Sequence, residues 1–150
     1  CSFCYYYTKP NSIDGFYNSF REYLKNGSID NVAPSLPTKV DESIIEVSGK
    51  KCLNTDFDGM QDNYGIARAN IYKNGKLYTY RVATRKGSYL NSVNIGISYP
   101  KSFFDKEFNL INDSAEYEIE LIDCSGNISL NKYKFMVTSS NGSITIKSLQ

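Results

Sequence analysis

Residues 66–84 read IARANIYKNGKLYTYRVAT, two runs rich in β-branched and aromatic residues on either side of Asn74-Gly75. An Asn-Gly pair tolerates the positive φ angles that a two-residue type I′ turn requires. The stretch therefore predicts a β-hairpin with strands at 66–73 and 76–84.

The alternation with a period of two continues through most of the chain after Pro37. In residues 116–122 the side chains of Tyr117, Ile119 and Leu121 share one face and three glutamates share the other. This pattern indicates a strand buried on one side. Residues 132–138 are its predicted partner through a turn at 125–127, which would set lysines near the glutamates. Further strands are expected at 40–48, 93–99 and 143–149, the last after an Asn141-Gly142 turn. Residues 102–108 have an ambiguous pattern, for which a single helical turn is one interpretation.

The N-terminal part has a different pattern. Apolar residues recur at three- and four-residue steps over residues 12–26, and Gly27 follows, so one amphipathic helix is expected there. Two prolines in residues 31–37 predict an extended, irregular linker. We expect a single domain in which residues 1–38 pack on a β-structure formed by residues 39–150.

The expected fold class is therefore mainly β. About six or seven short strands separated by turns indicate an antiparallel β-sandwich, or alternatively a barrel, with one N-terminal α-helix. Residues 117–127 resemble the late strand and turn of immunoglobulin-like bacterial surface modules. The chain has no Trp, and Ile122 stands two positions before Cys124, where immunoglobulin domains carry a Tyr. The resemblance implies the sandwich and nothing further.

Four cysteines, Cys1, Cys4, Cys52 and Cys124, bear on the compartment. Cys52 and Cys124 flank the expected β region, so we predict a disulfide between them, although four cysteines allow three pairings. Cys1 followed by Ser2 resembles the start of a mature bacterial lipoprotein. That resemblance implies a lipid anchor at Cys1 and an extracytoplasmic location, in the periplasm or at the outer membrane; a secreted module is the alternative.

Composition excludes several functional classes. The 150 residues carry 17 Lys and Arg against 16 Asp and Glu, a formal charge of +1, which argues against a nucleic-acid partner. Without histidine, Ser-His-Asp and Cys-His catalysis and the common metallohydrolase ligand sets are impossible. The spacing of the four cysteines makes no recognisable zinc pattern. We expect no enzyme. A carboxylate-dependent glycosidase using Asp56, Asp58 or Glu46 is a third alternative.

An oxygen-rich stretch, residues 54–62, suggests a cation. Its side-chain oxygens recur at alternate positions before a glycine, as calcium loops require. The spacing resembles the calcium loops of thrombospondin type 3 repeats, which implies possible Ca²⁺ ligation, with no cofactor otherwise required. The alternative is a turn whose side chains cap their own backbone. The residues that carry this resemblance are Asn54, Asp56, Asp58, Gly59 and Asp62.

Tyrosine is abundant, at 13 residues, and suits recognition surfaces because it combines a large ring with a hydroxyl. The expected function is a non-catalytic protein-binding module, such as an inhibitor or immunity lipoprotein or a component of a surface assembly. The alternative is a carbohydrate-binding or adhesion module that uses the same aromatic residues to hold a glycan. Cross-strand packing is the plain explanation for the hairpin tyrosines. The candidate partner-binding residues are Tyr5, Tyr6, Tyr7, Tyr72, Tyr78 and Tyr80.

Overall fold

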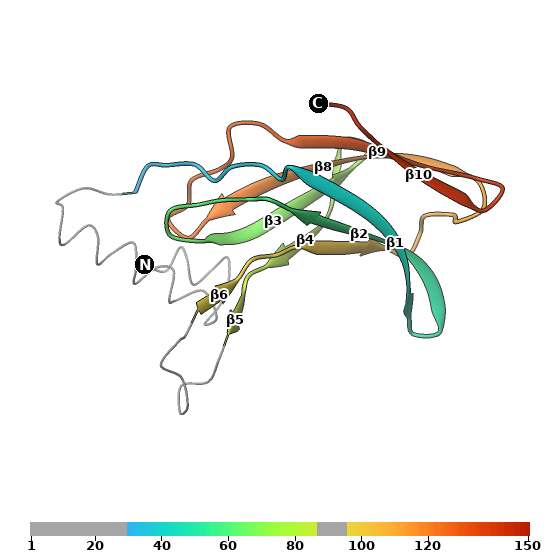
Figure 1. Cartoon of the computed structure of the whole chain (residues 1–150), viewed down its shortest axis with the longest axis horizontal. Coiled ribbons are helices and arrows are strands. Elements are labelled where there is room, and N and C mark those ends of the chain that lie inside the picture. The colour runs from blue at the N-terminus through green and yellow to red at the C-terminus, as the bar shows by residue number, and fades with distance from the viewer. Residues whose placement is uncertain (1–29, 87–95) are drawn as a thin grey trace.

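The computed structural model describes residues 30–86 and 96–150, and this part of the chain is mainly β-structure (Figure 1). The helix expected at 12–26 and the tyrosines at 5–7 lie outside the described residues. The described part contains no helix that is long and apolar enough to cross a membrane. Its strands are β1 Lys39–Val47, β2 Lys50–Asp58, β3 Ile66–Lys73, β4 Lys76–Val82, β5 Thr84–Lys86, β6 Gly96–Ser98, β7 Ser102–Asp105, β8 Asp113–Asp123, β9 Tyr133–Ser140 and β10 Ser143–Ser148.

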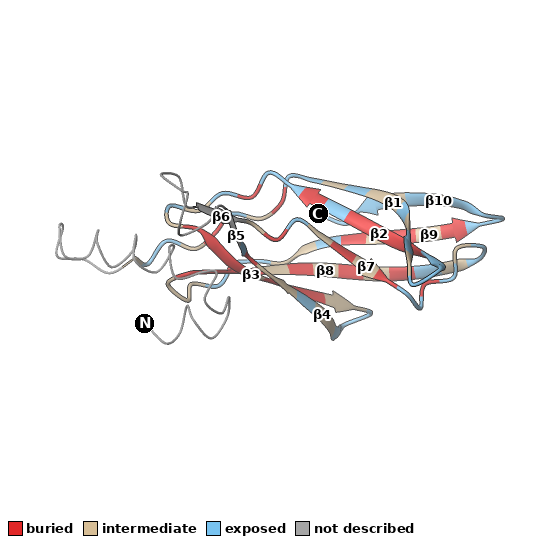
Figure 2. Ribbon diagram, turned by 90° about the horizontal axis from the view of Figure 1, so that it is seen from below, coloured by how far each residue is buried: buried red, intermediate tan, exposed pale blue. Residues whose placement is uncertain are grey.

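Two antiparallel sheets form the sandwich. One sheet has the order β1-β2-β7 and the other β10-β9-β8-β3-β4, while β5 and β6 make a separate small ribbon. Buried positions run along strands of both sheets (Figure 2). Between the layers, the ring of Phe103 lies 5.4 Å from that of Tyr117 and 6.4 Å from that of Phe135. The expected sandwich is confirmed, since an aromatic core joins two distinct sheets rather than one closed barrel.

The strand order corresponds to that of immunoglobulin-like sandwiches. Strands β1, β2 and β7 take the places of A, B and E, and β4, β3, β8 and β9 take those of C′, C, F and G, with β10 added outside G.

The predicted hairpins are confirmed. Asn74 and Gly75 have φ angles of 51° and 85° between β3 and β4, and Asn141 and Gly142 have 51° and 82° between β9 and β10. The predicted pairing of β8 with β9 also forms. Glu118 lies opposite Lys134, with 3.8 Å between the ammonium nitrogen and the carboxylate.

Two segments differ from the expectations. Residues 54–62 were expected to form an oxygen-rich loop, but residues 54–58 belong to β2, which pairs with β1 along nine residues. Burial explains the strand, because Leu53, Thr55 and Phe57 face the core. Residues 102–105 form a strand rather than a helical turn, because Phe103 pairs opposite Thr55 and enters the same core.

The predicted disulfide between Cys52 and Cys124 is wrong. Both residues are buried free thiols. Cys52 lies opposite Ile45, near the β1–β2 turn, whereas the amide of Cys124 donates to Gly65, beyond the other end of β2. The two thiols are thus separated by most of the length of the sandwich.

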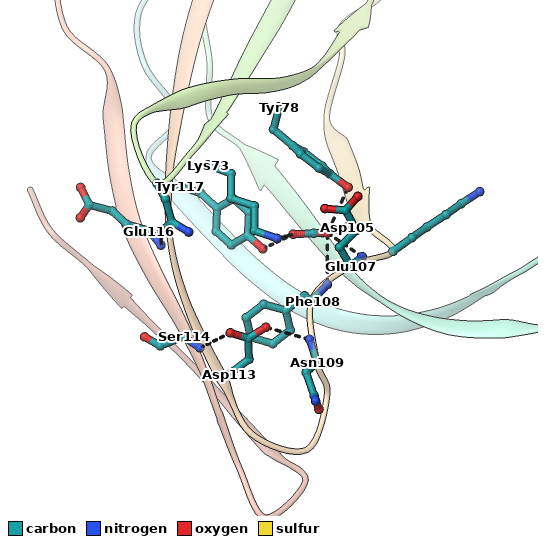
Figure 3. A network of polar contacts seen from close by, with 12 residues as sticks. Lys73, Tyr78, Asp105, Glu107, Phe108, Asn109, Asp113, Ser114, Glu116 and Tyr117 are labelled. Carbon is teal, nitrogen blue, oxygen red and sulfur yellow. Dashed lines mark hydrogen bonds and ion pairs between the residues drawn. The ribbon is translucent and has the colours of Figure 1, made fainter.

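A buried carboxylate, Asp105, ties the two sheets together at the end of β7 (Figure 3). Its Oδ2 accepts hydrogen bonds from the Lys73 ammonium at 2.6 Å and from the Tyr117 hydroxyl at 2.7 Å. Its Oδ1 accepts from the Tyr78 hydroxyl at 3.0 Å and from the amides of Glu107 and Phe108. Burial by itself would raise the pKa of Asp105, but these bonds hold it below its usual value.

A β-bulge explains why Tyr78 reaches Asp105. Ile71 pairs with Thr79 and Tyr72 pairs with Leu77, so Tyr78 is the extra residue in β4. A bulge redirects the side chain that it carries. Burial, followed by the charge of Asp105, raises the pKa of Tyr78 to about 12.

Candidate binding site

Several connections that are distant in the sequence meet at one end of the sandwich, on the left of Figure 1. Lys39 lies opposite Asp58 and Ile66 lies opposite Asp123. The linker before β1, the loop 59–65 and the connection 124–132 therefore leave the sheets at the same end.

Three carboxyl groups converge where these segments meet. Asp30 comes from the linker, Asp62 from the loop 59–65 and Asp123 from the end of β8. One oxygen from each lies within 4.8 Å of the others. The side chain of Asp123 is fully buried, and those of Asp30 and Asp62 are half-buried.

Backbone amides fix two of these carboxylates. Asp123 Oδ1 accepts from the amides of Ser125 at 2.9 Å and Asn127 at 2.8 Å. Asp62 Oδ2 accepts from the amides of Tyr64 at 3.1 Å and Gly65 at 2.9 Å. Such short side-chain-to-backbone turns hold the carboxylates rigidly in their loops.

Two asparagines fasten the linker to the loops. The side-chain nitrogen of Asn127 donates to the backbone carbonyl of Asp30 at 3.2 Å and to Asp123 Oδ2 at 2.9 Å. The side-chain nitrogen of Asn63 donates to Asp30 Oδ1 at 2.9 Å. The three segments are thus joined by direct hydrogen bonds around the carboxyl group of Asp30.

Burial and the repulsion between the negative charges of the three carboxyl groups raise the pKa values of Asp62 and Asp123. Burial, opposed by hydrogen bonds from Asn127 and reinforced by the charges of Asp62 and Asp30, raises the pKa of Asp123 to about 7. Burial and the charge of Asp30 also raise the pKa of Asp62. A side-chain hydrogen bond with Asp123 acts in the opposite direction and lowers the pKa of Asp62. Within residues 30–86 and 96–150, the ion pairs are Lys39–Asp41, Lys73–Asp105 and Lys134–Glu118, and none of them neutralises this cluster.

A pocket of about 560 Å³ opens beside the carboxyl cluster, with Asp62 in its wall. Much of the wall is apolar, from Val32, Ala33, Met60 and Tyr99. Burial and the charge of Asp62 raise the pKa of Tyr99, which keeps its hydroxyl neutral. Ser35, Gln61 and Asn63 complete the wall, so polar and apolar residues contribute equally to the lining.

Exposed apolar side chains belong to the same segments. Val32 in the linker is 53% exposed, and Ile128 and Leu130 in the connection 124–132 are 52% and 90% exposed. Ile128 forms a bridge with Ile122, the residue before Asp123. These three residues give the loop end an apolar component next to its negative charge.

The residues of the predicted calcium loop do not form one loop, because some of them lie on β2 and the others follow that strand. Asn54, Asp56 and Asp58 lie on that strand, where the Asn54 side chain donates to Asp56 Oδ1 at 3.2 Å and Asp58 Oδ1 accepts from the amide of Gly59. Asp62 alone joins a carboxyl cluster. Its neighbours Asp30 and Asp123 were not identified from the sequence, since they lie about thirty and sixty residues away along the chain.

The predicted tyrosines fall on different faces. Tyr72 and Tyr80 lie on the outer face of the larger sheet. The ammonium nitrogen of Lys132 lies 3.9 Å from the ring centre of Tyr72. The guanidinium carbon of Arg68 lies 3.9 Å from the ring centre of Tyr80. Tyr78 points between the sheets. The three residues therefore do not form one patch.

The carboxylates considered for glycosidase chemistry do not converge. Glu46 lies opposite Lys51, next to the β1–β2 turn, while Asp58 lies opposite Lys39 at the other end of the same hairpin. Asp56 is exposed on β2 between them.

Comparison with known proteins finds no matching protein-family model and no significant sequence match among curated proteins.

Proposed function

We propose that this chain is a non-catalytic module that binds a protein partner through the loop end of its sandwich. The observation that carries the proposal is the pocket beside the rigid carboxyl cluster, built by the loops that correspond to the antigen-binding loops of immunoglobulin domains. An inhibitor, an immunity protein or a component of a surface assembly would each use such a surface.

The exposed side chains favour a protein over a glycan. Protein interfaces have an apolar centre with polar groups around it, and Val32, Ile128 and Leu130 supply apolar surface around the charged cluster. Sugar binding on the outer sheet would need bare aromatic faces. Tyr72 and Tyr80 each have a cation over one face of the ring, which occupies the surface a sugar would stack on.

The free thiols remove one argument about location. Cys52 and Cys124 are unpaired, so the disulfide no longer supports an oxidising compartment.

The test compares two substitutions that each place a charge on an exposed apolar residue. Leu130→Asp changes the loop end, and Ile44→Asp changes β1 of the other sheet, where Ile44 is 51% exposed. A partner would be captured from native extract by crosslinking, purified, and titrated against each variant, in parallel with a glycan array. We expect Leu130→Asp to weaken binding by about tenfold or more, and Ile44→Asp to leave it unchanged.

Two results would contradict the proposal. The first is a purified partner whose affinity is equal for wild type and Leu130→Asp. The second is saturable binding to glycans that Leu130→Asp does not affect, with no protein partner.

A further inference from the structure

We infer that the side of the sandwich between β4 and β7 binds a doubly charged oxyanion, such as a phosphate group, through Lys50, Arg81 and Lys106. These three cations gather around Phe104. The surface is formed by different residues from those of the loop end, and it does not require a protein partner there.

Strands β4 and β7 form neighbouring edges of the two sheets on one side of the sandwich. Phe104, on β7, has a cation from each edge near its half-buried ring. The guanidinium carbon of Arg81, on β4, lies 5.0 Å from the centre of that ring. The ammonium nitrogen of Lys106, directly after β7, lies 5.8 Å from the same centre. Two separate sheets therefore direct positive charge to one aromatic side chain.

A third cation reaches the same segment from the start of β2. The ammonium group of Lys50 donates to the backbone carbonyl of Lys106 at 2.9 Å. Positive charges held this close repel one another. The attraction of a ring face for an exposed cation is weak, so Phe104 alone does not offset the charge of three cations.

No carboxylate neutralises the three cations within residues 30–86 and 96–150, because none of the ion pairs there includes them. The two acidic neighbours of Lys106 in the sequence contact other groups. Asp105 is buried and bonded to Lys73, and Glu107 lines a separate pocket beside Lys73. The surface around Phe104 therefore keeps a local excess of positive charge, although the chain as a whole is nearly neutral.

The hydrogen-bond donors of these side chains suit an oxyanion. A guanidinium has five N–H groups. On Arg81 one of them donates to the carbonyl of Tyr80 at 3.3 Å, and no other acceptor contacts this side chain in the described part of the chain. The contact with Phe104 restrains the guanidinium, which leaves donors for two oxygens of one anion. A dianion would also compensate most of the charge, whereas one carboxylate would leave two positive charges without a partner.

Inorganic phosphate and inorganic sulfate are the probes for a first test. Each is titrated into the full chain at pH 8 and followed by NMR, with the ionic strength held constant by sodium chloride. Acetate, which carries one charge, is the matched probe. We expect saturable shifts at the amides of Phe104 and Lys106 with both dianions, and weaker binding of acetate.

The matched variants are Lys106→Gln in the cluster and Lys147→Gln on β10, where Lys147 is exposed at the far edge of the larger sheet. Each removes one positive charge from an exposed position. Lys106→Gln should weaken phosphate binding by about fivefold, the upper end for one exposed charge pair, and Lys147→Gln should leave it unchanged. Arg81→Lys keeps the charge but loses the forked donor geometry, so it should also weaken binding.

A second test distinguishes a soluble phosphate compound from a lipid headgroup. Vesicles of phosphatidylcholine are compared with vesicles that also contain phosphatidic acid, whose headgroup is a phosphate monoester. Binding to the second kind alone, reduced by Lys106→Gln and not by Lys147→Gln, would identify a lipid. Binding of free phosphate without binding to either vesicle would identify a soluble compound.

Three results would overturn the inference. They are the absence of saturable binding to the dianions and to the phosphatidic acid vesicles, acetate binding as tight as that of phosphate, and equal losses in Lys106→Gln and Lys147→Gln. Partner binding at the loop end is measured separately through Leu130, so none of these results bears on the proposed protein interface.

Discussion

The hydrogen-bonded carboxylate of Asp105 makes a quantitative prediction about stability. Asp105→Asn keeps the volume of the side chain and one carbonyl oxygen, which can still accept from Tyr78 and from the amides of Glu107 and Phe108. It removes the negative charge that pairs with Lys73 and places an amide NH₂ where Oδ2 accepted two hydrogen bonds.

The expected cost follows from the burial of the pair. Asp105 is fully buried and the Lys73 side chain is 17% exposed. Removing one partner of a buried ion pair costs about 3–5 kcal/mol. Since Lys73 can recover some contact with water, we expect the lower end, about 3 kcal/mol. For a domain of this length that corresponds to a fall in Tm of about 6–12 °C.

Urea unfolding would measure this loss of stability. Tyrosine fluorescence would serve as the signal, because the chain has 13 Tyr and no Trp. Tyr78→Phe is the control, since it removes one hydrogen bond and leaves the ion pair, at a cost of about 1 kcal/mol. Lys73→Met added to Asp105→Asn should cost less than the sum of the two single changes.

The pH dependence gives a second check. The folded pKa of Asp105 is below its unfolded value, so its stabilisation is complete above about pH 5 and disappears as the pH falls through the folded pKa. The difference between wild type and Asp105→Asn should therefore shrink in acid. A loss below about 1 kcal/mol at pH 7, or strict additivity with Lys73→Met, would refute the reasoning.

Two further predictions concern the loop end. Because the folded pKa values of Asp62 and Asp123 are raised, the wild type should lose stability as the pH rises from about 4 to about 7. Asp62→Asn, whose carbonyl can keep the two amide hydrogen bonds, should be about 1 kcal/mol more stable than wild type at pH 8; equal urea midpoints at pH 5 and pH 8 for both proteins would contradict this. Gly59 has φ +87°, and an added Cβ would collide with the Thr38 hydroxyl, so Gly59→Ala should cost about 2–3 kcal/mol. Gly75→Ala, at φ +85° with no atom within 4 Å, should cost only about 1 kcal/mol, and equal losses in thermal unfolding would show that Thr38 adjusts freely.

The local part of the fold could be predicted from the sequence. Asn74-Gly75 and Asn141-Gly142 fix turn geometry through their own backbone preferences, so both hairpins were found. Buried and more exposed side chains alternate along β8 and β9 because one face of the sheet packs against the core. Strand β2 was missed because its Asn, Thr and Asp residues have the composition of a loop, and only the packing of Leu53 and Phe57 against the other sheet makes it a strand.

The candidate site was predicted only in part. Asp62 was singled out by its acidic surroundings, but its real neighbours depend on which strands lie side by side, and no local pattern reveals that. The same reason explains why the predicted disulfide is wrong. Cys52 lies on β2, whereas Cys124 follows the end of β8 in the other sheet, and only the strand register shows that the two residues are far apart along the sandwich. Tyr78 was grouped with Tyr80 because a bulge cannot be seen in a period of two.

The hydrogen bond between Asn127 and Asp30 spans 97 residues, whereas each hairpin closes over a few. Contacts of such long sequence separation carry a large loop-closure entropy and form late, after the local hairpins are in place. We therefore expect the loop end to assemble late in folding and to open before the sheets do. Amide exchange at Asn127 should be governed by local opening, so a ligand that fills the pocket would be seen there as slower exchange long before it changed the exchange of β8 or β9.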